Sequence, residues 1–265
     1  MDISILFSKL FERNPVLTWA GIINFAGFAL TILLSFIDKR KVSGVNVWLK
    51  PMKFFSSIAI YLFTMSWILF YLSADITVIS ISIAAVMYFE MFLIFFQAAR
   101  GTTSHFNTSS PFNVIVYASM GTAITINTII CSYVLYLFFT PEVKVAGSYL
   151  WGVRAGLFIF IIASLEGFAM TKRNSHTVNA KDEGTGIPFL NWSREGGDLR
   201  VAHFIGIHAL QILPFTAVFV KSVTAIIIIS LIYFVTSIGL FIQAIKGKVF
   251  LSFIGKLKEN NAEAQ

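Results

Sequence analysis

The chain has 265 residues, of which 57% are hydrophobic and only 12% are charged. A soluble domain of this size carries about twice that charged fraction, so the composition excludes an ordinary soluble protein and indicates an integral membrane protein. The single cysteine, Cys131, excludes an internal disulfide and a metal site built on paired cysteines. In a membrane protein, the net charge of +7 indicates cationic loops. Membrane lipids are therefore the expected partners, and nucleic acid is not.

Seven segments are apolar and long enough to cross the hydrocarbon core of a bilayer, which takes about 20 helical residues. They are Val16–Ile37, Phe54–Leu72, Ile76–Phe96, Phe112–Phe139, Leu150–Met170, Val201–Val220 and Val223–Ile245. An unbroken helix over the last two segments would be about 67 Å long, so a tight turn is predicted at Lys221. The predicted fold class is all-α, a polytopic transmembrane bundle of seven spans. An arrangement with six spans and one re-entrant segment is the alternative.

The whole chain, residues 1–265, is predicted to be one transmembrane domain with a long loop over 171–200 and a tail over 246–265. With seven spans, fifteen of the 20 lysines and arginines fall on the side that holds these two segments. Cationic loops face the cytoplasm, so the C-terminus is predicted to be cytoplasmic and the N-terminus outside.

The first polar string begins the second span, where Lys50 and Lys53 flank Pro51. Proline suits the first turn of a helix because its missing N–H is not needed there. The two lysines are predicted to bind an anionic substrate. Contact with anionic lipid headgroups is the alternative interpretation.

The second string follows the third span and contains Gln97, Arg100, His105 and Asn107. Glu90 precedes Gln97 by seven residues, so the two share one face of a helix. Glu90 lies about 15 Å deeper than Arg100, and a carboxyl group at that depth is expected to be protonated or paired.

The third string opens the sixth span with Asp198, Arg200, His203, His208 and Gln211. Ionisable groups inside a span are expensive and usually face a bundle interior, where they bind or react. His203 and His208 are five residues apart and do not form a chelating pair, whereas His208 and Gln211 share a face.

One further acid and one loop belong to the same half of the bundle. His208 and Glu90 lie at similar depth, so a contact between them is geometrically allowed, and Glu166 is another acid within a span. The connection over 171–200 is about 30 residues long without clear periodicity, which is typical of a functional lid or of a flexible linker.

The polar strings resemble those of an uncharacterised family of bacterial polytopic membrane proteins of about seven spans. The two long matching strings are residues 97–107 and 197–211, and shorter ones lie at 50–54, 176–178 and 191–193. The resemblance implies a multi-pass protein of the bacterial cytoplasmic (inner) membrane. It supplies no activity, so function is argued from the residues.

All four histidines and the acids named above lie on the predicted cytoplasmic half, which favours a site that opens to the cytoplasm. The leading hypothesis is a membrane-embedded, metal-dependent enzyme that acts on a lipid or other amphipathic anionic substrate. Catalytic roles are predicted for Glu90, Arg100, Asp198 and Arg200; substrate binding for Lys50, Lys53, Gln97, Asn107 and Gln211; and ligation of a divalent metal, zinc or iron, for His105, His203 and His208.

Two alternatives stay open at this stage. The first is a haem or other redox-cofactor protein with two of the same histidines as axial ligands. The second is a transporter or sensor in which acids and histidines relay protons.

Overall fold

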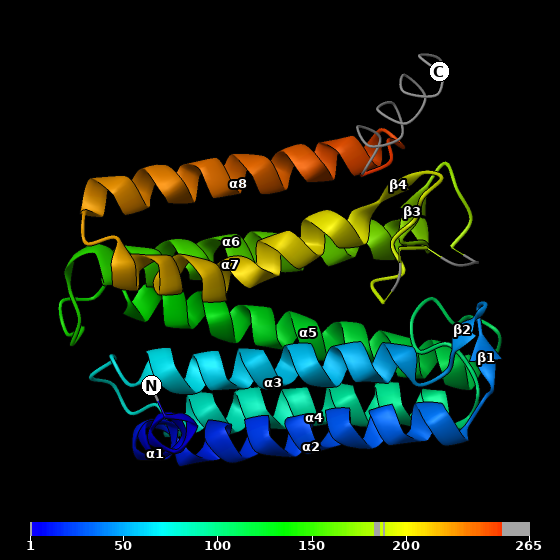
Figure 1. Ribbon diagram of the computed structural model, residues 1–265, viewed down its shortest axis with the longest axis horizontal. Helices are drawn as coiled ribbons and strands as arrows, with labels where there is room; N and C mark the ends of the chain where they lie inside the picture. The colour runs from blue at the N-terminus through cyan, green and yellow to red at the C-terminus, as the bar shows by residue number, and fades with distance from the viewer. Residues whose placement is uncertain (1, 183–185, 188, 251–265) are drawn as a thin grey trace.

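A computed structural model describes residues 2–182, 186–187 and 189–250. Seven long helices form the bundle, and all seven are apolar and long enough to cross a membrane. They are α2 (Pro15–Ile37), α3 (Leu49–Leu69), α4 (Thr77–Ala99), α5 (Pro111–Leu137), α6 (Gly147–Arg173), α7 (Leu199–Phe219) and α8 (Val223–Ile245). They run side by side (Figure 1). The predicted all-α class and the seven spans are confirmed.

The tight turn predicted at Lys221 is also confirmed. Helix α7 ends at Phe219 and α8 begins at Val223. The hydroxyl of Ser222 accepts a hydrogen bond of 3.3 Å from the N–H of Ala225, which caps α8. Both helices have full spanning length, so the six-span alternative is not supported.

A short helix, α1 (Ile3–Arg13), precedes the first span and was not predicted. It lies across the axis of α2 (Figure 1) and exposes Ile3 and Ile5. The guanidinium of Arg13 lies 3.7 Å from the centre of the Trp67 ring and donates a hydrogen bond of 3.2 Å to the Trp67 carbonyl. These contacts fix α1 to the end of α3.

Helices α6 and α7 approach each other through glycine. A Cβ atom at Gly152 would lie 2.9 Å from the carbonyl oxygen of Leu213, and one at Gly156 would lie 2.9 Å from that of Ala209. Small residues allow such backbone contact in membranes, where packing rather than the hydrophobic effect drives helix association. The two helices are therefore held at a separation that only glycine permits.

The main core lies between α3, α4, α5 and α6, where fully buried side chains such as Met65, Ile83 and Leu157 meet. Tyr61 of α3 stacks on Phe160 of α6, with ring centres 5.5 Å apart. This core joins the first half of the chain to the second.

The connections at one end of the bundle carry all four short strands. Strand β1 (Lys41–Val42) pairs with β2 (Val45–Asn46) between α2 and α3, and β3 (Thr177–Val178) pairs with β4 (Gly197–Asp198) between α6 and α7. Both pairs lie at the right of Figure 1, with the end of α8, whereas α1 lies at the other end. We call this strand-bearing end, with the α4–α5 connection, the polar end.

The predicted 171–200 loop thus begins and ends on paired strands. The predicted tail over 246–265 is described only to residue 250, and the rest lies outside the described residues. The side of the membrane that the polar end faces stays a prediction.

Candidate functional site

The polar end gathers charged and imidazole side chains from four parts of the chain. The ammonium group of Lys50 lies within electrostatic reach of Glu90, Lys53, Arg200 and Asp182. The fold therefore brings together several residues that the sequence singled out, from α3, α4, the α6–α7 connection and α7.

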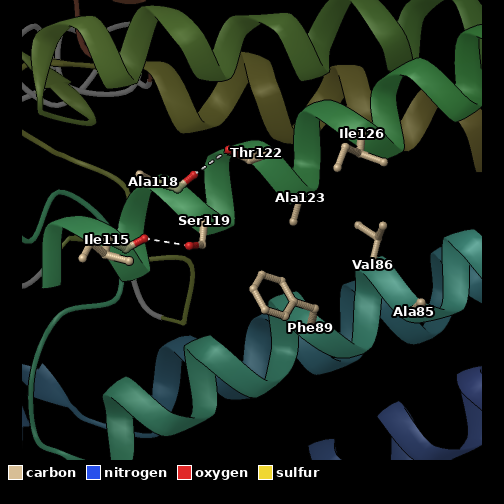
Figure 2. Close-up of a pocket in the computed structure, with 9 residues that line it drawn as sticks. All are labelled: Ala85, Val86, Phe89, Ile115, Ala118, Ser119, Thr122, Ala123 and Ile126. Carbon is tan, nitrogen blue, oxygen red and sulfur yellow. Dashed lines mark hydrogen bonds between the residues drawn. The ribbon is translucent and has the colours of Figure 1, made fainter. Parts of the chain in front are cut away.

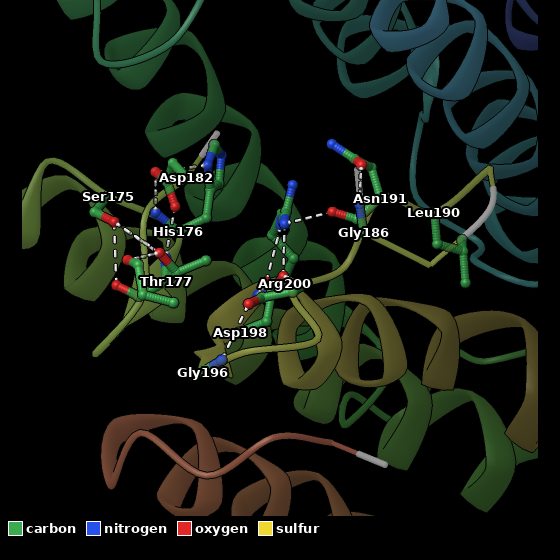
Figure 3. A network of polar contacts seen from close by, with 12 residues as sticks. Ser175, His176, Thr177, Asp182, Gly186, Leu190, Asn191, Gly196, Asp198 and Arg200 are labelled. Carbon is green, nitrogen blue, oxygen red and sulfur yellow. Dashed lines mark hydrogen bonds and ion pairs between the residues drawn. The ribbon is translucent and has the colours of Figure 1, made fainter. Parts of the chain in front are cut away.

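Asp198 anchors the α6–α7 connection. Its buried carboxylate accepts hydrogen bonds from the backbone N–H of Ser193 at 2.7 Å and of Arg200 at 3.0 Å. The Arg200 guanidinium pairs with the same carboxylate, with an Nη2–Oδ2 distance of 2.5 Å, and donates to the Asn191 carbonyl at 2.7 Å (Figure 3). These contacts give Asp198 and Arg200 a positioning role. Their predicted catalytic roles stay a prediction.

Residues 189–192, which we call the strap, link α3 to the start of α7. The ammonium group of Lys53 donates a hydrogen bond of 3.2 Å to the carbonyl of Leu190. Asn191 has a φ of 56°, a left-handed conformation that asparagine tolerates, and its side-chain oxygen accepts from the N–H of Gly186 at 2.8 Å. Trp192 packs edge-on against Phe204 of α7. The strap therefore covers the polar ends of both helices.

His176 and Asp182 form a pair that the sequence did not predict. The Nδ1 atom of His176 lies 3.3 Å from Oδ2 of Asp182, whose carboxylate also accepts the backbone N–H groups of His176 and Thr177 (Figure 3). Burial lowers the pKa of His176 below its usual value, although the hydrogen bond to Asp182 opposes the shift. Burial acts to raise the pKa of Asp182, but the hydrogen bonds from His176 and Thr177 outweigh it and hold that pKa well below its usual range. The imidazole is consequently neutral at pH 7.

His105 lies close to this pair. Its Nδ1 atom is 3.1 Å from the hydroxyl of Ser104, and its ring faces Phe54 of α3 at 5.7 Å between centres. Burial lowers the pKa of His105 well below its usual value, and the positive charge of Lys50 acts in the same direction. A second neutral imidazole therefore belongs to the polar end.

Gln97, Arg100 and Asn107 serve the connection between α4 and α5. Arg100 donates hydrogen bonds to the side-chain oxygens of Gln97 at 2.6 Å and of Asn113 at 3.0 Å. The amide of Asn107 donates to the Thr102 hydroxyl at 2.8 Å. These side chains bond within their own connection, and their predicted catalytic and substrate-binding roles stay predictions.

The polar residues of α7 point to two different helices. His203 has its Nδ1 atom 2.8 Å from the carbonyl oxygen of Ala163 in α6. His208 has its Nδ1 atom 3.3 Å from the side-chain oxygen of Gln211, whose amide donates a hydrogen bond of 3.2 Å to the hydroxyl of Thr64 in α3. Of the two histidines, His208, with Gln211, therefore belongs to the side of α7 that faces α3, whereas His203 faces α6.

The predicted metal site gains no support. Across residues 2–182, 186–187 and 189–250, no three His, Cys, Asp or Glu side chains are placed to hold a metal ion. His105, His203 and His208 each have a different neighbour, as described above. Metal ligation and haem ligation by these residues stay predictions.

The acids within the spans lack hydrogen-bond partners. Oε2 of Glu90 and both carboxyl oxygens of Glu166 are buried and make no hydrogen bond to any described residue. The similar depth of Glu90 and His208 allowed a contact between them. Within the described residues the two side chains form no hydrogen bond, and His208 bonds Gln211 instead. The described group whose charge acts on Glu90 is Lys50.

A separate hollow of about 560 Å³ lies between α4 and α5 (Figure 2). It is lined by Ala85, Val86, Phe89, Ile115, Ala118, Ser119, Thr122, Ala123 and Ile126. None of these side chains titrates and none was predicted as a site residue. The titratable side chains described above therefore lie outside this hollow.

Comparison with models of protein families, with curated proteins and with solved structures finds no match for this chain. The resemblance to a bacterial family stays an expectation, and function rests on the geometry of the polar end.

Proposed function

We propose that this protein is a membrane-embedded enzyme that binds an anionic, amphipathic substrate at the polar end and uses His176 for acid–base chemistry on it. The proposal rests on one observation. At the polar end, two lysines that form no ion pair within the described residues, Lys50 and Lys53, lie near the His176–Asp182 pair.

Lys50 and Lys53 supply the binding charge. The ion pairs within the described chain are Asp38–Arg40, His176–Asp182 and Asp198–Arg200, so neither lysine is in one. Both lysines are partly buried, and a partly buried cation without a counter-ion is unfavourable. Lys50 also stands in the first turn of α3, where backbone N–H groups favour an anion, and Lys53 follows in the second turn. A phosphate or carboxylate headgroup would stabilise this end of α3.

His176 supplies the chemistry. A neutral imidazole that donates its Nδ1 proton to Asp182 leaves Nε2 with a free lone pair. This is the arrangement of a general base, whose orientation and tautomer are fixed by a carboxylate. His176 is proposed to take a proton from water or a substrate hydroxyl and to return it to the leaving group.

The proposed location follows from charge. Because the connections at the polar end carry most of the cationic residues, we place this end at the cytoplasmic face of a bacterial inner membrane. The substrate would then belong to the inner leaflet.

Binding to the detergent-purified protein tests the proposal. Calorimetry with dihexanoyl phosphatidylglycerol, an anionic lipid, should show binding that dihexanoyl phosphatidylcholine does not match. Lys53→Gln should weaken the anionic lipid about tenfold, which corresponds to about 1.4 kcal/mol. Lys144→Gln, in the α5–α6 connection at the opposite end, is the matched control and should bind like the wild type.

Turnover completes the test. Incubation with a panel of anionic lipids, followed by mass spectrometry of the products, should reveal a reaction that His176→Gln abolishes without loss of binding. Equal affinity of the wild type for the two dihexanoyl lipids would contradict the proposal. Metal analysis and an absorption spectrum of the same preparation test the predicted zinc, iron and haem.

A proton relay is the second candidate, and one observation favours it. The carboxyl oxygens of Glu90 and Glu166 without hydrogen-bond partners are placed as relay groups often are within membranes. In liposomes that enclose a pH-sensitive dye, the wild type would then carry protons, and Glu90→Gln and Glu166→Gln would not. Equal proton flux with and without the protein would reject this candidate.

A further inference from the structure

We infer that the substrate is a membrane lipid that enters sideways from the bilayer, along a seam between α3 and α7. The seam is defined by Lys53 and Thr64 of α3 and by Arg200, His208 and Gln211 of α7. The inference rests on the proposed function, since the seam leads to the polar end. It adds the route and therefore the substrate class.

The two helices are tied at two levels. At the polar end, Lys53 and Arg200 both bind the strap, through the carbonyls of Leu190 and Asn191. Deeper, Thr64 and Gln211 bond each other. Each helix advances eleven residues between its two ties, so α3 and α7 follow one another for about 16 Å, roughly half the hydrocarbon thickness.

The stretch between the ties is loosely closed. Helix α7 makes few contacts with α3 and is instead packed closely on α6. Ile60 of α3 and Phe204 of α7 lie between the two levels and are 47% and 37% exposed. The seam is consequently accessible from the hydrocarbon phase.

The polar lining of the seam needs an explanation. Residues 200, 208 and 211 fall on one face of α7, since they are separated by eight and three positions. His208, Gln211 and Thr64 are partly exposed although they lie within spans, and such groups are costly to present to hydrocarbon. Their mutual hydrogen bonds limit that cost when the seam is closed.

A lipid headgroup supplies the missing partner when the seam opens. Its phosphate and hydroxyl oxygens accept from the Gln211 amide and the Thr64 hydroxyl, which replaces the bond from Gln211 to Thr64 and the bond from the Thr64 hydroxyl to the Ile60 carbonyl. The acyl chains stay among other acyl chains, so no apolar surface is transferred to water. Lys53 and Arg200 attract the negative headgroup toward the polar end.

Cross-linking the seam tests the route. The variant Thr64→Cys/Gln211→Cys is made in a Cys131→Ala background and placed in nanodiscs. A bifunctional methanethiosulfonate reagent then cross-links the two new cysteines, which closes the seam. Closure should weaken binding of long-chain phosphatidylglycerol, supplied in the bilayer, by at least about tenfold. Dihexanoyl phosphatidylglycerol, which arrives from water, should keep its affinity, and reduction of the cross-link should restore the long-chain lipid.

Thr18→Cys/Ser66→Cys is the matched control. These hydroxyl oxygens lie 2.9 Å apart between α2 and α3, which are packed along their length, so the cross-link should change neither affinity. Loss of both ligands, or of neither, after closure of the seam would overturn the route while the proposed function stands. Failure of both ligands to bind the protein before cross-linking would overturn the proposed function and the route together.

Photolabelling gives a second measurement on the unmodified protein. Long-chain phosphatidylglycerol with a diazirine next to its headgroup should label peptides of α3 and α7, and excess dihexanoyl phosphatidylglycerol should reduce that label. Labelling spread evenly over all helices would overturn the route.

Discussion

The interfaces of helix α7 with α6 and with α3 are built in opposite ways. Against α6 it is held by backbone contact, because Gly152 and Gly156 leave room for the carbonyls of Leu213 and Ala209. Against α3 its contacts are few, and they include the hydrogen bond from Gln211 to Thr64. Helices in backbone contact cannot move relative to each other without losing that contact. A contact made by the ends of side chains separates when the side chains change rotamer. Helix α7 is therefore fixed against α6 and can separate from α3.

The largest expected effect is on the glycine side. Gly156→Leu places a side chain where a Cβ alone would already lie 2.9 Å from a carbonyl oxygen, so α6 and α7 must separate. We expect a loss of about 3 kcal/mol in the free energy of unfolding, measured by denaturation in mixed micelles. Gly167→Leu on the same helix is the control, because no atom lies within 4 Å of the Cβ position there. Equal losses in the two variants would show that the interface is not tight.

The next effect concerns the strap above the seam. Asp198→Asn removes the charge that holds Arg200, and its carboxylate is fully buried, so we expect a loss of about 2 kcal/mol. Asp38→Asn changes the solvent-exposed Asp38–Arg40 pair and should cost much less than Asp198→Asn. The same denaturation measurement applies. A larger loss for Asp38→Asn than for Asp198→Asn would contradict the assigned positions.

The seam itself should contribute little stability. Gln211→Leu removes its hydrogen bond to Thr64, and we expect a change of about 0.6 kcal/mol or less. Tyr233→Phe removes a hydrogen bond of 2.6 Å to the carbonyl of Ile205, between α8 and α7, and should cost about 1 kcal/mol. Thermal unfolding in detergent measures the stability loss of each variant. A loss above that of Tyr233→Phe in the Gln211 variant would mean that the seam is a structural interface.

The smallest effect is a dependence of stability on pH. Burial lowers the pKa of His105 well below 6.5, so the unfolded chain takes up a proton that the folded chain does not. Stability should therefore fall as the pH decreases below about 6.5, because the unfolded state binds more protons there. His105→Gln should flatten the melting temperature between pH 7 and about pH 5. An identical pH profile in the variant would contradict the assignment.

Much of the fold could be predicted from the sequence because a bilayer imposes a length and an apolar composition on each span. The seven apolar segments agree with α2 to α8, and the turn at Lys221 followed from the length limit alone. Helix α1 was missed because its eleven residues are too short and too mixed in polarity to be recognised as a span.

Less of the site could be predicted from the sequence, because many of its contacts are made by loop residues, which have no regular spacing. Spacing on a helix correctly paired His208 with Gln211, but no spacing rule links His176 to Asp182 six residues later in a loop. The partner of Gln211, Thr64, is an ordinary residue in sequence and becomes important only when α3 lies beside α7. Long-range pairs of this kind are fixed by packing, which a single sequence does not reveal.

The short helix α1 also determines how the protein sits in its bilayer. Its apolar face and its basic end, where Arg13 contacts Trp67, are features of an interfacial helix, so we expect it to lie at the level of the headgroups. Trp67 and Lys50 lie near the two ends of α3 and are about 26 Å apart along its axis, close to the thickness of a hydrocarbon core of roughly 30 Å. A thinner bilayer would have to stretch to reach both levels or leave the lysines outside it. The protein should therefore be sorted, and active, according to membrane thickness.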